Sequence, residues 1–266
     1  MPSHMRYFKK QADLKTENGQ NVNVYNLDIQ DEEDILNSWA KHLREHYCLD
    51  SEIDFFRSGT GLSRKDYLNK VKFPDSTASL GSAVMSGDFA EILVHDYIEF
   101  FELYYTTRTR YRNKVNRNSS TMGSDVLGYK CSNVDSPSPK DELIVLEVKA
   151  QSSETNPKPM LQTAVNDSAK DEIRLAESLN AEVQRLVYGN RHAEAKVIQR
   201  FQNRTDRPYQ IKFSAVAVHS TYSYDEDLIK QVDLDGHPDD NINLLVIHSE
   251  RLMEFVKEMY VRASEC

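Results

Sequence analysis

Cysteines and long hydrophobic runs are both scarce in this sequence of 266 residues. The three cysteines, Cys48, Cys131 and Cys266, are too few and too scattered for a disulfide framework or a zinc ribbon. No apolar run approaches the roughly 18 residues of a membrane span, and the N-terminus lacks a signal-peptide core. We therefore expect a cytoplasmic protein with reduced thiols and no membrane segment.

Internal repeats, coiled-coil heptads and a glycine-rich phosphate loop are also absent from the sequence. Hydrophobic residues make up 39% of the chain and charged residues 28%, a balance typical of soluble globular proteins. We predict an N-terminal α/β extension at residues 1–79, followed by a core at residues 80–266. Residues 1–4 precede a second methionine and look like a cloning remnant, so the fold prediction excludes them.

The order of the periodic segments predicts an α/β fold with a central mixed β-sheet flanked by helices. Strands are expected at residues 20–29, 123–129, 142–151, 211–219 and 242–248. Helices are expected at residues 31–47, 64–71, 86–101, 160–201 with a break near Gly189, and 250–262. In the third of these helices, Ser86 or Asp88 could serve as the N-cap.

The segment at residues 142–151 carries charges where a buried strand should carry only core residues. Its first half is a continuous apolar run, which is typical of a strand buried on both faces. Glu147 and Lys149 lie two positions apart and therefore share one face of the strand. Because a buried charge is costly unless it is paired or binds a metal, the two form either an ion pair at a sheet edge or part of a site.

A second acid, Asp125, lies upstream in a short apolar segment bounded by glycines. A turn-rich loop at residues 131–141 connects this segment to the strand that carries Glu147. Two strands joined by such a loop can pair as neighbours, which would bring Asp125 beside Glu147. The order of an aspartate followed by Glu-Val-Lys resembles the PD-(D/E)XK nuclease superfamily.

A third piece is the helix predicted at residues 86–101. Its apolar residues follow helical spacing, and Glu91 would flank the buried stripe. The resemblance to the superfamily implies that a glutamate on this first helix joins the site. The alternative interpretation of Glu91 is a solvated first-turn acid that the helix dipole favours.

Together the three pieces are similar to the HamA family, the nuclease subunits of Hachiman antiphage systems. The pieces are residues 87–91, 123–129 and 146–151. Ser124 stands where superfamily members often have a proline before the first acid. The resemblance implies a DNA endonuclease of antiviral defence. It also implies a HamB-like helicase subunit that forms a heterodimer with the nuclease and restrains it until DNA is damaged or invaded.

The chemistry of such a site requires these residue types. Mg²⁺ prefers oxygen ligands, which Asp125, Glu147 and the backbone carbonyl of Val148 could supply. Lys149 could orient a metal-bound water or stabilise the transition state. The motif therefore implies Mg²⁺, with Mn²⁺ as the alternative metal. Glu91 and Gln151 are predicted to assist in catalysis.

The charge of the chain bears on DNA binding. A net charge of −9 argues against easy binding of nucleic acid. Residues 103–124, however, contain no acid and carry five cations: Arg108, Arg110, Arg112, Lys114 and Arg117. This window is either a patch that tracks the DNA backbone toward Asp125 or a solvated strand with alternating arginines.

The sequence thus favours a Mg²⁺-dependent DNA endonuclease with little sequence specificity. One alternative is a catalytically silent module of the same fold that binds DNA or a partner. Another is a sequence-specific restriction or junction-resolving nuclease of the same superfamily. His42, His46 and Cys48 could also be assembled into a metal site, but no fourth ligand is evident and most surface histidines bind nothing.

Overall fold

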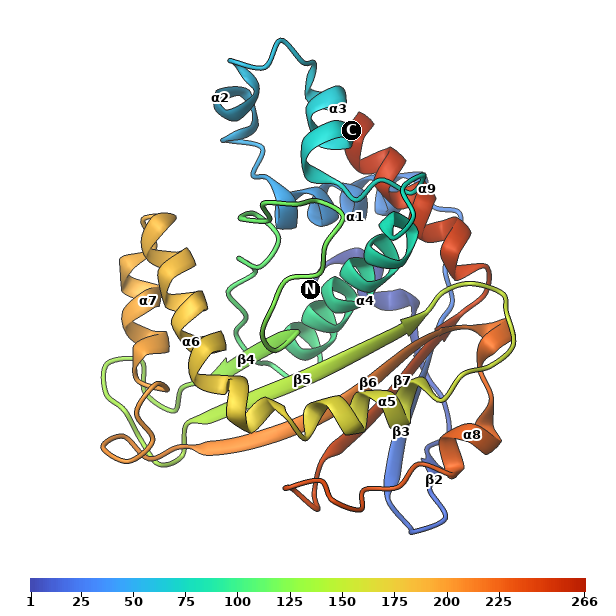
Figure 1. Ribbon diagram of the computed structural model, residues 1–266, viewed down its shortest axis with the longest axis vertical. Coiled ribbons are helices and arrows are strands. Elements are labelled where there is room, and N and C mark those ends of the chain that lie inside the picture. Colours follow the sequence, from blue (N-terminus) through green and yellow to red (C-terminus); the bar gives the residue numbers. More distant parts are fainter.

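The computed structural model describes residues 1–266, except the side chain of Glu172. A single seven-stranded sheet has the order β1-β3-β7-β6-β5-β4, with β2 attached to β3 (Figure 1). The strands are β1 Phe8–Lys10, β2 Leu14–Lys15, β3 Asn21–Leu27, β4 Val126–Lys130, β5 Glu142–Gln151, β6 Gln210–Ser220 and β7 Asn243–Ser249. This mixed sheet confirms the predicted α/β class.

The described chain has nine α-helices, and not all of them touch the sheet (Figure 1). They are α1 Glu33–Tyr47, α2 Ile53–Arg57, α3 Arg64–Tyr67, α4 Gly81–Phe100, α5 Met160–Ser168, α6 Asp171–Tyr188, α7 His192–Gln199, α8 Glu226–Lys230 and α9 Leu252–Glu265. Short helical turns of other types lie at Ser3–Tyr7, Leu68–Lys72 and Thr221–Ser223. Within the described residues, no helix combines the length and the hydrophobicity needed to cross a membrane.

The strand pairing determines where the predicted acids lie. Strands β3, β7, β6 and β5 run parallel to one another, whereas β4 pairs with β5, and β1 and β2 pair with β3, in antiparallel fashion. Val126 lies opposite Leu146 in this pair. Asp125 precedes Val126 and Glu147 follows Leu146, so the same antiparallel register places Asp125 opposite Glu147. This confirms the prediction that the two strands pair as neighbours.

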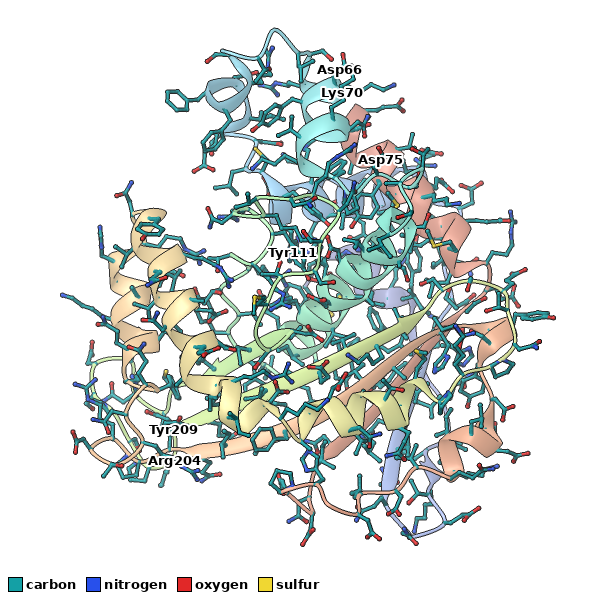
Figure 2. All side chains as sticks on the ribbon, in the orientation of Figure 1. Asp66, Lys70, Asp75, Tyr111, Arg204 and Tyr209 are labelled. Atoms are coloured by element: carbon teal, nitrogen blue, oxygen red, sulfur yellow. The ribbon has the colours of Figure 1, made fainter. Side chains whose placement is uncertain are left out.

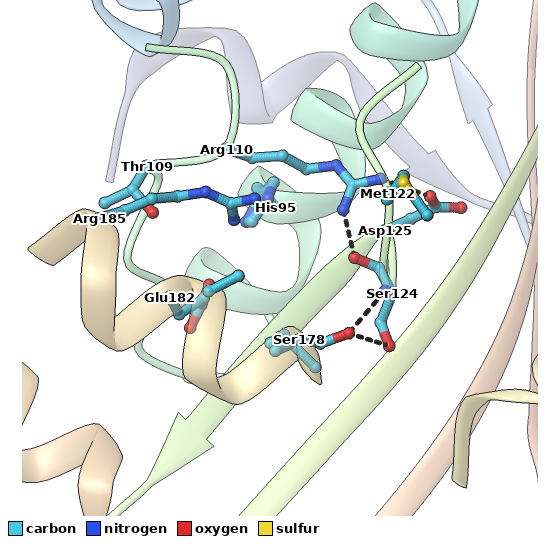
Figure 3. Close-up of a pocket in the computed structure, with 11 residues that line it drawn as sticks. His95, Thr109, Arg110, Met122, Ser124, Asp125, Ser178, Glu182 and Arg185 are labelled. Atoms are coloured by element: carbon cyan, nitrogen blue, oxygen red, sulfur yellow. Dashed lines mark hydrogen bonds and ion pairs between the residues drawn. The ribbon is translucent and has the colours of Figure 1, made fainter. Parts of the chain in front are cut away.

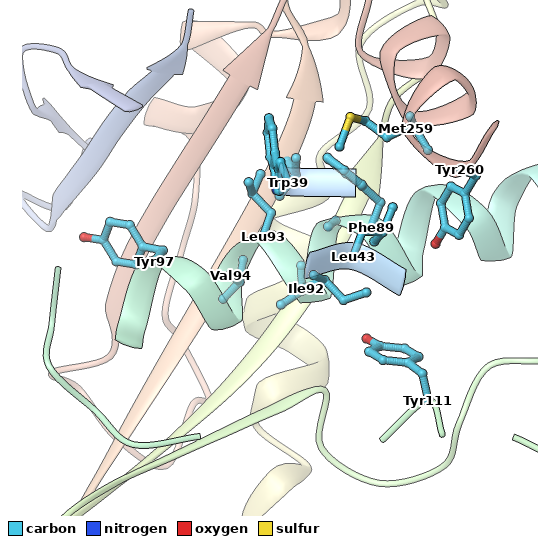
Figure 4. Packing of buried hydrophobic residues seen from close by; sticks show 14 of the residues in the cluster. Trp39, Leu43, Phe89, Ile92, Leu93, Val94, Tyr97, Tyr111, Met259 and Tyr260 are labelled. Carbon is cyan, nitrogen blue, oxygen red and sulfur yellow. The ribbon is translucent and has the colours of Figure 1, made fainter. Parts of the chain in front are cut away.

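Two hydrophobic cores lie on the two faces of the sheet, because successive side chains of β5 point in opposite directions. Ile144 and Leu146 belong to the core beneath α1, α4 and α9, whereas Leu143 and Val145 belong to the core beneath α5, α6 and α7. In the first core, aromatic and aliphatic residues of α1, α4 and α9 pack together, among them Trp39, Phe89 and Met259 (Figure 4). The sheet is thus buried on both faces, which explains its apolar strands.

Helix α4 begins earlier than predicted, at Gly81, so the predicted N-caps Ser86 and Asp88 are wrong. Both residues lie inside the helix and are buried. A side chain at Gly81 would place its Cβ 1.6 Å from the backbone oxygen of Asp75. Only glycine at this position allows the preceding turn to pack against the start of the helix. The observed helix is therefore longer at its N-terminus than the predicted one.

Residues 103–124, hereafter the basic loop, form neither a helix nor a strand in the structure, so the alternative of a solvated strand with alternating arginines is wrong. Leu103 and Arg108 have positive φ angles of 59° and 52°, which an extended strand does not accommodate. Its one backbone pairing with the sheet, within the described residues, is an isolated bridge between Tyr105 and Tyr129. The loop instead folds against α4 through its side chains.

The N-terminal segment also differs from the prediction, because His4 belongs to the folded core. It is 2% exposed, stacks on Trp39 with ring centroids 4.6 Å apart, and lies 3.0 Å from Asp96 through Nε2. The exclusion of residues 1–4 was therefore wrong. Strands β1 to β3 share one sheet with β5 to β7, and the predicted division between residues 79 and 80 stays a prediction.

Two glycines provide a matched test of the packing around α4 and β4. A Cβ at Gly128 would lie 2.8 Å from both Ile144 and Ile98, whereas nothing lies within 4 Å of one at Gly87. We expect Gly128→Ala to lower the free energy of unfolding by about 1–3 kcal/mol through overpacking. We expect Gly87→Ala, in mid-helix, to raise it by about 0.5–1 kcal/mol. Urea denaturation of both variants checks this, and equal effects would contradict the close approach of α4 to β4.

Candidate active site

The β4–β5 pair brings three predicted residues together. The Asp125 carboxylate accepts a hydrogen bond from the backbone N–H of Val148 at 3.0 Å. Glu147 is 4% exposed, and its Oε1 lies 2.7 Å from Nζ of Lys149. The adjacent positions of Asp125 and Glu147 follow from the strand register, and those of Glu147 and Lys149 from the two-residue period of the strand.

Arg110 of the basic loop links Asp125 to Glu91, the predicted acid on α4. Its Nη2 donates a hydrogen bond to Asp125 Oδ1 at 3.0 Å, and its Nε lies 3.0 Å from Glu91 Oε2 in an ion pair. The same guanidinium donates to the backbone oxygen of Ser124 at 2.5 Å (Figure 3). It also donates to the backbone oxygen of Thr121 at 2.8 Å. The Arg110 side chain is 8% exposed, so these contacts are buried.

Tyr111 adds a second contact from the basic loop to Glu91. It lies in the centre of the molecule beside α4 (Figure 2), and its hydroxyl donates to Glu91 Oε2 at 2.5 Å. Tyr111 itself is 1% exposed. The glutamate is therefore an internal residue, and its interpretation as a solvated first-turn acid does not hold.

Burial and the neighbouring carboxylates disfavour the ionised forms of the acids at this site. Burial raises the pKa of Glu91 to about 8, with Asp125 adding to the rise and Arg110 opposing it. Burial and the charge of Asp125 likewise raise the pKa of Glu147 to about 7. For Arg110, the charges of Glu91 and Asp125 outweigh burial and raise its pKa above the usual value. A cation between these carboxylates therefore stabilises their charged forms.

Helices α5 and α6 bring two acids to this face that the sequence analysis missed. Asp167 Oδ2 lies 2.8 Å from Nζ of Lys149, so the ammonium stands between Asp167 and Glu147. Asp171 is fully buried, accepts a hydrogen bond from Ser124 Oγ at 3.1 Å, and has a pKa that burial raises to about 6. Their spacing of four positions on the helical tract after β5 was the available signal.

The donor set fits a divalent cation in its chemistry. Glu91, Asp125 and Glu147 offer carboxylate oxygens, and Glu147 Oε2 is buried without a hydrogen-bond partner. Within the described side chains, three donor atoms that all lie within 4.8 Å of one another occur only at His4, His42 and Asp96. The oxygens of Glu91, Asp125 and Glu147 therefore do not converge as closely as they would around one ion.

The cluster of His4, His42 and Asp96 already has a cation of its own. Arg108 Nη2 lies 2.8 Å from Asp96 Oδ1, and Nη1 lies 3.2 Å from His42 Nε2 and 2.6 Å from His46 Nε2. Although burial opposes it, contacts with His4, His42 and Arg108 hold the pKa of Asp96 well below its usual value. Since Arg108 balances this carboxylate, the cluster is an ion-pair network, and Cys48 lies outside it.

The five cations predicted to bind DNA all contact the protein itself. Their partners are Asp96 and Glu99 for Arg108, Glu91 and Asp125 for Arg110, the backbone of Glu45 for Arg112, Asp88 for Lys114, and Asp75 for Arg117. These contacts attach the basic loop to α4 and to the segments beside it. Binding of DNA by these residues stays a prediction.

Gln151 lies at the end of β5 and fixes the loop that follows. Its amide donates to Thr155 Oγ1 at 3.0 Å and to the backbone oxygen of Asn156 at 2.8 Å, and its Oε1 accepts from the backbone N–H of Lys158 at 2.9 Å. The side-chain amide of Gln151 is thus hydrogen-bonded within the loop that follows β5. Its predicted assistance in catalysis stays a prediction.

A small cavity lies next to Asp125, between the basic loop and α6 (Figure 3). Its volume is about 20 Å³, which is close to the space that one water molecule needs. His95, Arg110 and Arg185 line it. It is too small to receive a nucleotide, so substrate would have to approach the acids from outside this cavity.

The protein has a mixed β-sheet flanked by helices, and the β4–β5 hairpin at its edge carries buried acids beside a lysine. This arrangement defines a protein with a nuclease-like α/β core. The HamA family model matches residues 4–263 of this chain. The chain therefore belongs to the HamA family, which makes it a protein of a Hachiman defence system. No curated protein matches the chain.

Proposed function

We propose that this chain is a Mg²⁺-dependent DNA endonuclease of antiphage defence, with Mn²⁺ as an alternative metal. The observation that supports this proposal is the meeting of Asp125 and Glu147 across the β4–β5 pair, with Glu91 and Lys149 beside them. Membership of the HamA family supports the setting in defence. We expect hydrolysis of phosphodiester bonds with little sequence specificity.

The residues divide the chemistry among them. Asp125, Glu147 and the backbone carbonyl of Val148 would hold the metal, which when bound lowers the pKa of a water and neutralises charge on the phosphate. The hydrogen bonds that Lys149 donates to Asp167 and Glu147 outweigh burial and raise its pKa above the usual value, so it remains an ammonium. It therefore stabilises negative charge in the transition state and does not remove a proton.

Cleavage of supercoiled plasmid DNA with and without Mg²⁺ tests this proposal. We expect nicked circles with the metal and none after addition of EDTA. Absence of cleavage with either Mg²⁺ or Mn²⁺, by the chain alone and together with its partner, would instead support the catalytically silent binding module.

Asp125→Asn is expected to weaken the binding of Mg²⁺ at least about tenfold, which corresponds to about 1.4 kcal/mol. The lost charge is what holds the ion against its hydration. Titration calorimetry measures the affinity. Asp135→Asn is the matched control, because Asp135 is exposed in the loop between β4 and β5. Unchanged affinity in Asp125→Asn would place the metal elsewhere.

A helicase partner that restrains the nuclease and delivers DNA is part of the proposal. Its support is electrostatic. The chain has a net charge of −9, and four of the five cations of the basic loop are paired with its own acids, so the isolated chain offers little attraction to a polyanion. A partner that binds DNA would supply the missing affinity.

A further inference from the structure

Arg110 lies between two acids of the site and binds both of them. We propose that Arg110, which also pairs with Glu91, is an internal counter-ion that competes with the divalent metal for Asp125. Metal binding then requires the guanidinium to withdraw. This inference rests on the proposed function, because it concerns how the same site is regulated.

The contacts of the two carboxylates support competition. Asp125 uses Oδ2 to accept from the backbone of Val148, and its Oδ1 is the atom that Arg110 contacts at 3.0 Å. Glu91 uses Oε2 for both Tyr111 and Arg110. An ion that approaches Asp125 Oδ1 therefore meets a guanidinium of the same charge sign on the same atom. Two cations so close together in a buried site repel each other strongly.

The surroundings of Arg110 are those of an internal counter-ion and differ from those of a surface cation that binds DNA. Its side chain is 8% exposed, and its remaining donors bind the backbone oxygens of Thr121 and Ser124. These two residues belong to the same loop as Arg110. The guanidinium is therefore directed inward, at the acids, by the loop that carries it.

The rest of the basic loop is attached to α4 independently of Arg110. Arg108 pairs with Asp96 at 2.8 Å, and Lys114 pairs with Asp88 at 2.5 Å. Neither cation contacts Asp125 or Glu91. Withdrawal can thus be a change of side-chain conformation at Arg110 alone, with the loop still held on both sides. In the metal-free protein, Arg110 thus neutralises the charge of the acids. The metal concentration then determines whether the metal replaces the guanidinium at Asp125.

Calorimetric titration of the full chain with Mg²⁺ at pH 8.5 tests the proposal, because protons compete least for carboxylates at high pH. Arg110→Gln removes the competitor, and Mg²⁺ should bind about tenfold more tightly than to the parent. Arg112→Gln is the matched control. It removes the same charge from the same loop, and its contact is with the backbone of Glu45. Its affinity for Mg²⁺ should equal that of the parent.

Thermal unfolding supplies a second readout that does not depend on activity. In EDTA, Arg110→Gln should unfold at a lower temperature than Arg112→Gln, and saturating Mg²⁺ should raise its Tm more than it raises that of the parent. Should Arg110→Gln fail to fold, Arg110→Lys keeps a charge but cannot bridge both carboxylates, and it should also bind Mg²⁺ more tightly than the parent.

The outcomes separate the two proposals. If the parent binds Mg²⁺ but Arg110→Gln and Arg110→Lys bind it equally or more weakly, the competition is refuted and the proposed function stands. Weaker binding would make Arg110 a residue that positions the acids. If the parent binds neither Mg²⁺ nor Mn²⁺, the metal site fails, and the competition is refuted with it.

Discussion

Glu147→Gln and Lys149→Ala are each expected to reduce Mg²⁺-dependent nicking of plasmid DNA by about 10²–10³-fold or more. Glu147 would lose the charge that holds the metal, and the Lys149 variant would lose the ammonium that stabilises the phosphate. Both side chains lie at the same end of β5, where they contact each other at 2.7 Å. Nicking rates measured at equal protein concentration give the comparison.

The fold should survive both changes. Glu147 has a buried oxygen without a partner and a pKa that burial raises to about 7, so its charge does not favour the folded state. Glu142→Gln is the matched control at the other end of β5, where Glu142 contacts Lys212 at 2.7 Å and Tyr104 at 2.6 Å. This control should cleave like the parent. Parental activity in the Glu147 or Lys149 variant would remove these residues from the site.

Without metal, the free energy of unfolding is expected to fall by at least about 1.4 kcal/mol between pH 6.5 and 8.5, the equivalent of one pK unit. Burial raises the pKa of Glu91 to about 8 and that of Glu147 to about 7, from ordinary values near 4.5. The folded protein therefore keeps protons in this range that the unfolded chain has released. Stability falls with rising pH wherever the folded state binds more protons.

Histidines determine where this window begins. Burial lowers the pKa of His95 to about 3 and that of His219 to about 4, so at these two side chains the unfolded chain binds more protons than the folded one up to about pH 6.5. Their contribution to stability rises with pH and opposes that of the acids below this value. Above it, these two histidines lose their remaining protons in the unfolded chain within about one pH unit, so their opposing contribution is small and the acids dominate.

Urea denaturation in EDTA at a series of pH values measures this dependence. Glu91→Gln cannot ionise, so its stability should change less between pH 6.5 and 8.5 than that of the parent. Saturating Mg²⁺ should also flatten the parent's profile, because it replaces protons at the carboxylates. A stability that rises across this window in EDTA would show that the acids are not buried as the structure has them.

The facing acids could be predicted from the sequence because their positions depend on local rules. The alternation of a strand puts Glu147 and Lys149 on one face, and the loop at 131–141 makes β4 and β5 neighbours. Asp125 then lies opposite Glu147 by register. These rules involve only residues close together in the chain, or strands joined by one loop.

The partners of the basic loop could not be predicted in the same way. An arginine in a window without acids is equally suited to DNA phosphates and to protein carboxylates, and composition does not distinguish the two. Arg110 reaches Glu91 from 19 positions along the chain, and its partner depends on how the loop folds against α4. Likewise, Asp167 reaches Lys149 only because α5 packs against β5.

The pairing of β3 with β7 has a consequence for synthesis of the chain. Residues 21–27 are synthesised long before their parallel neighbour, residues 243–249. Contacts so distant in sequence slow folding, because a long stretch of chain must be brought together before they form. Strand β3, and β1 and β2 attached to it, can therefore join the sheet only after residues 243–249 have been synthesised. A ribosome that stalls before residue 243 leaves this whole edge of the protein without its neighbour.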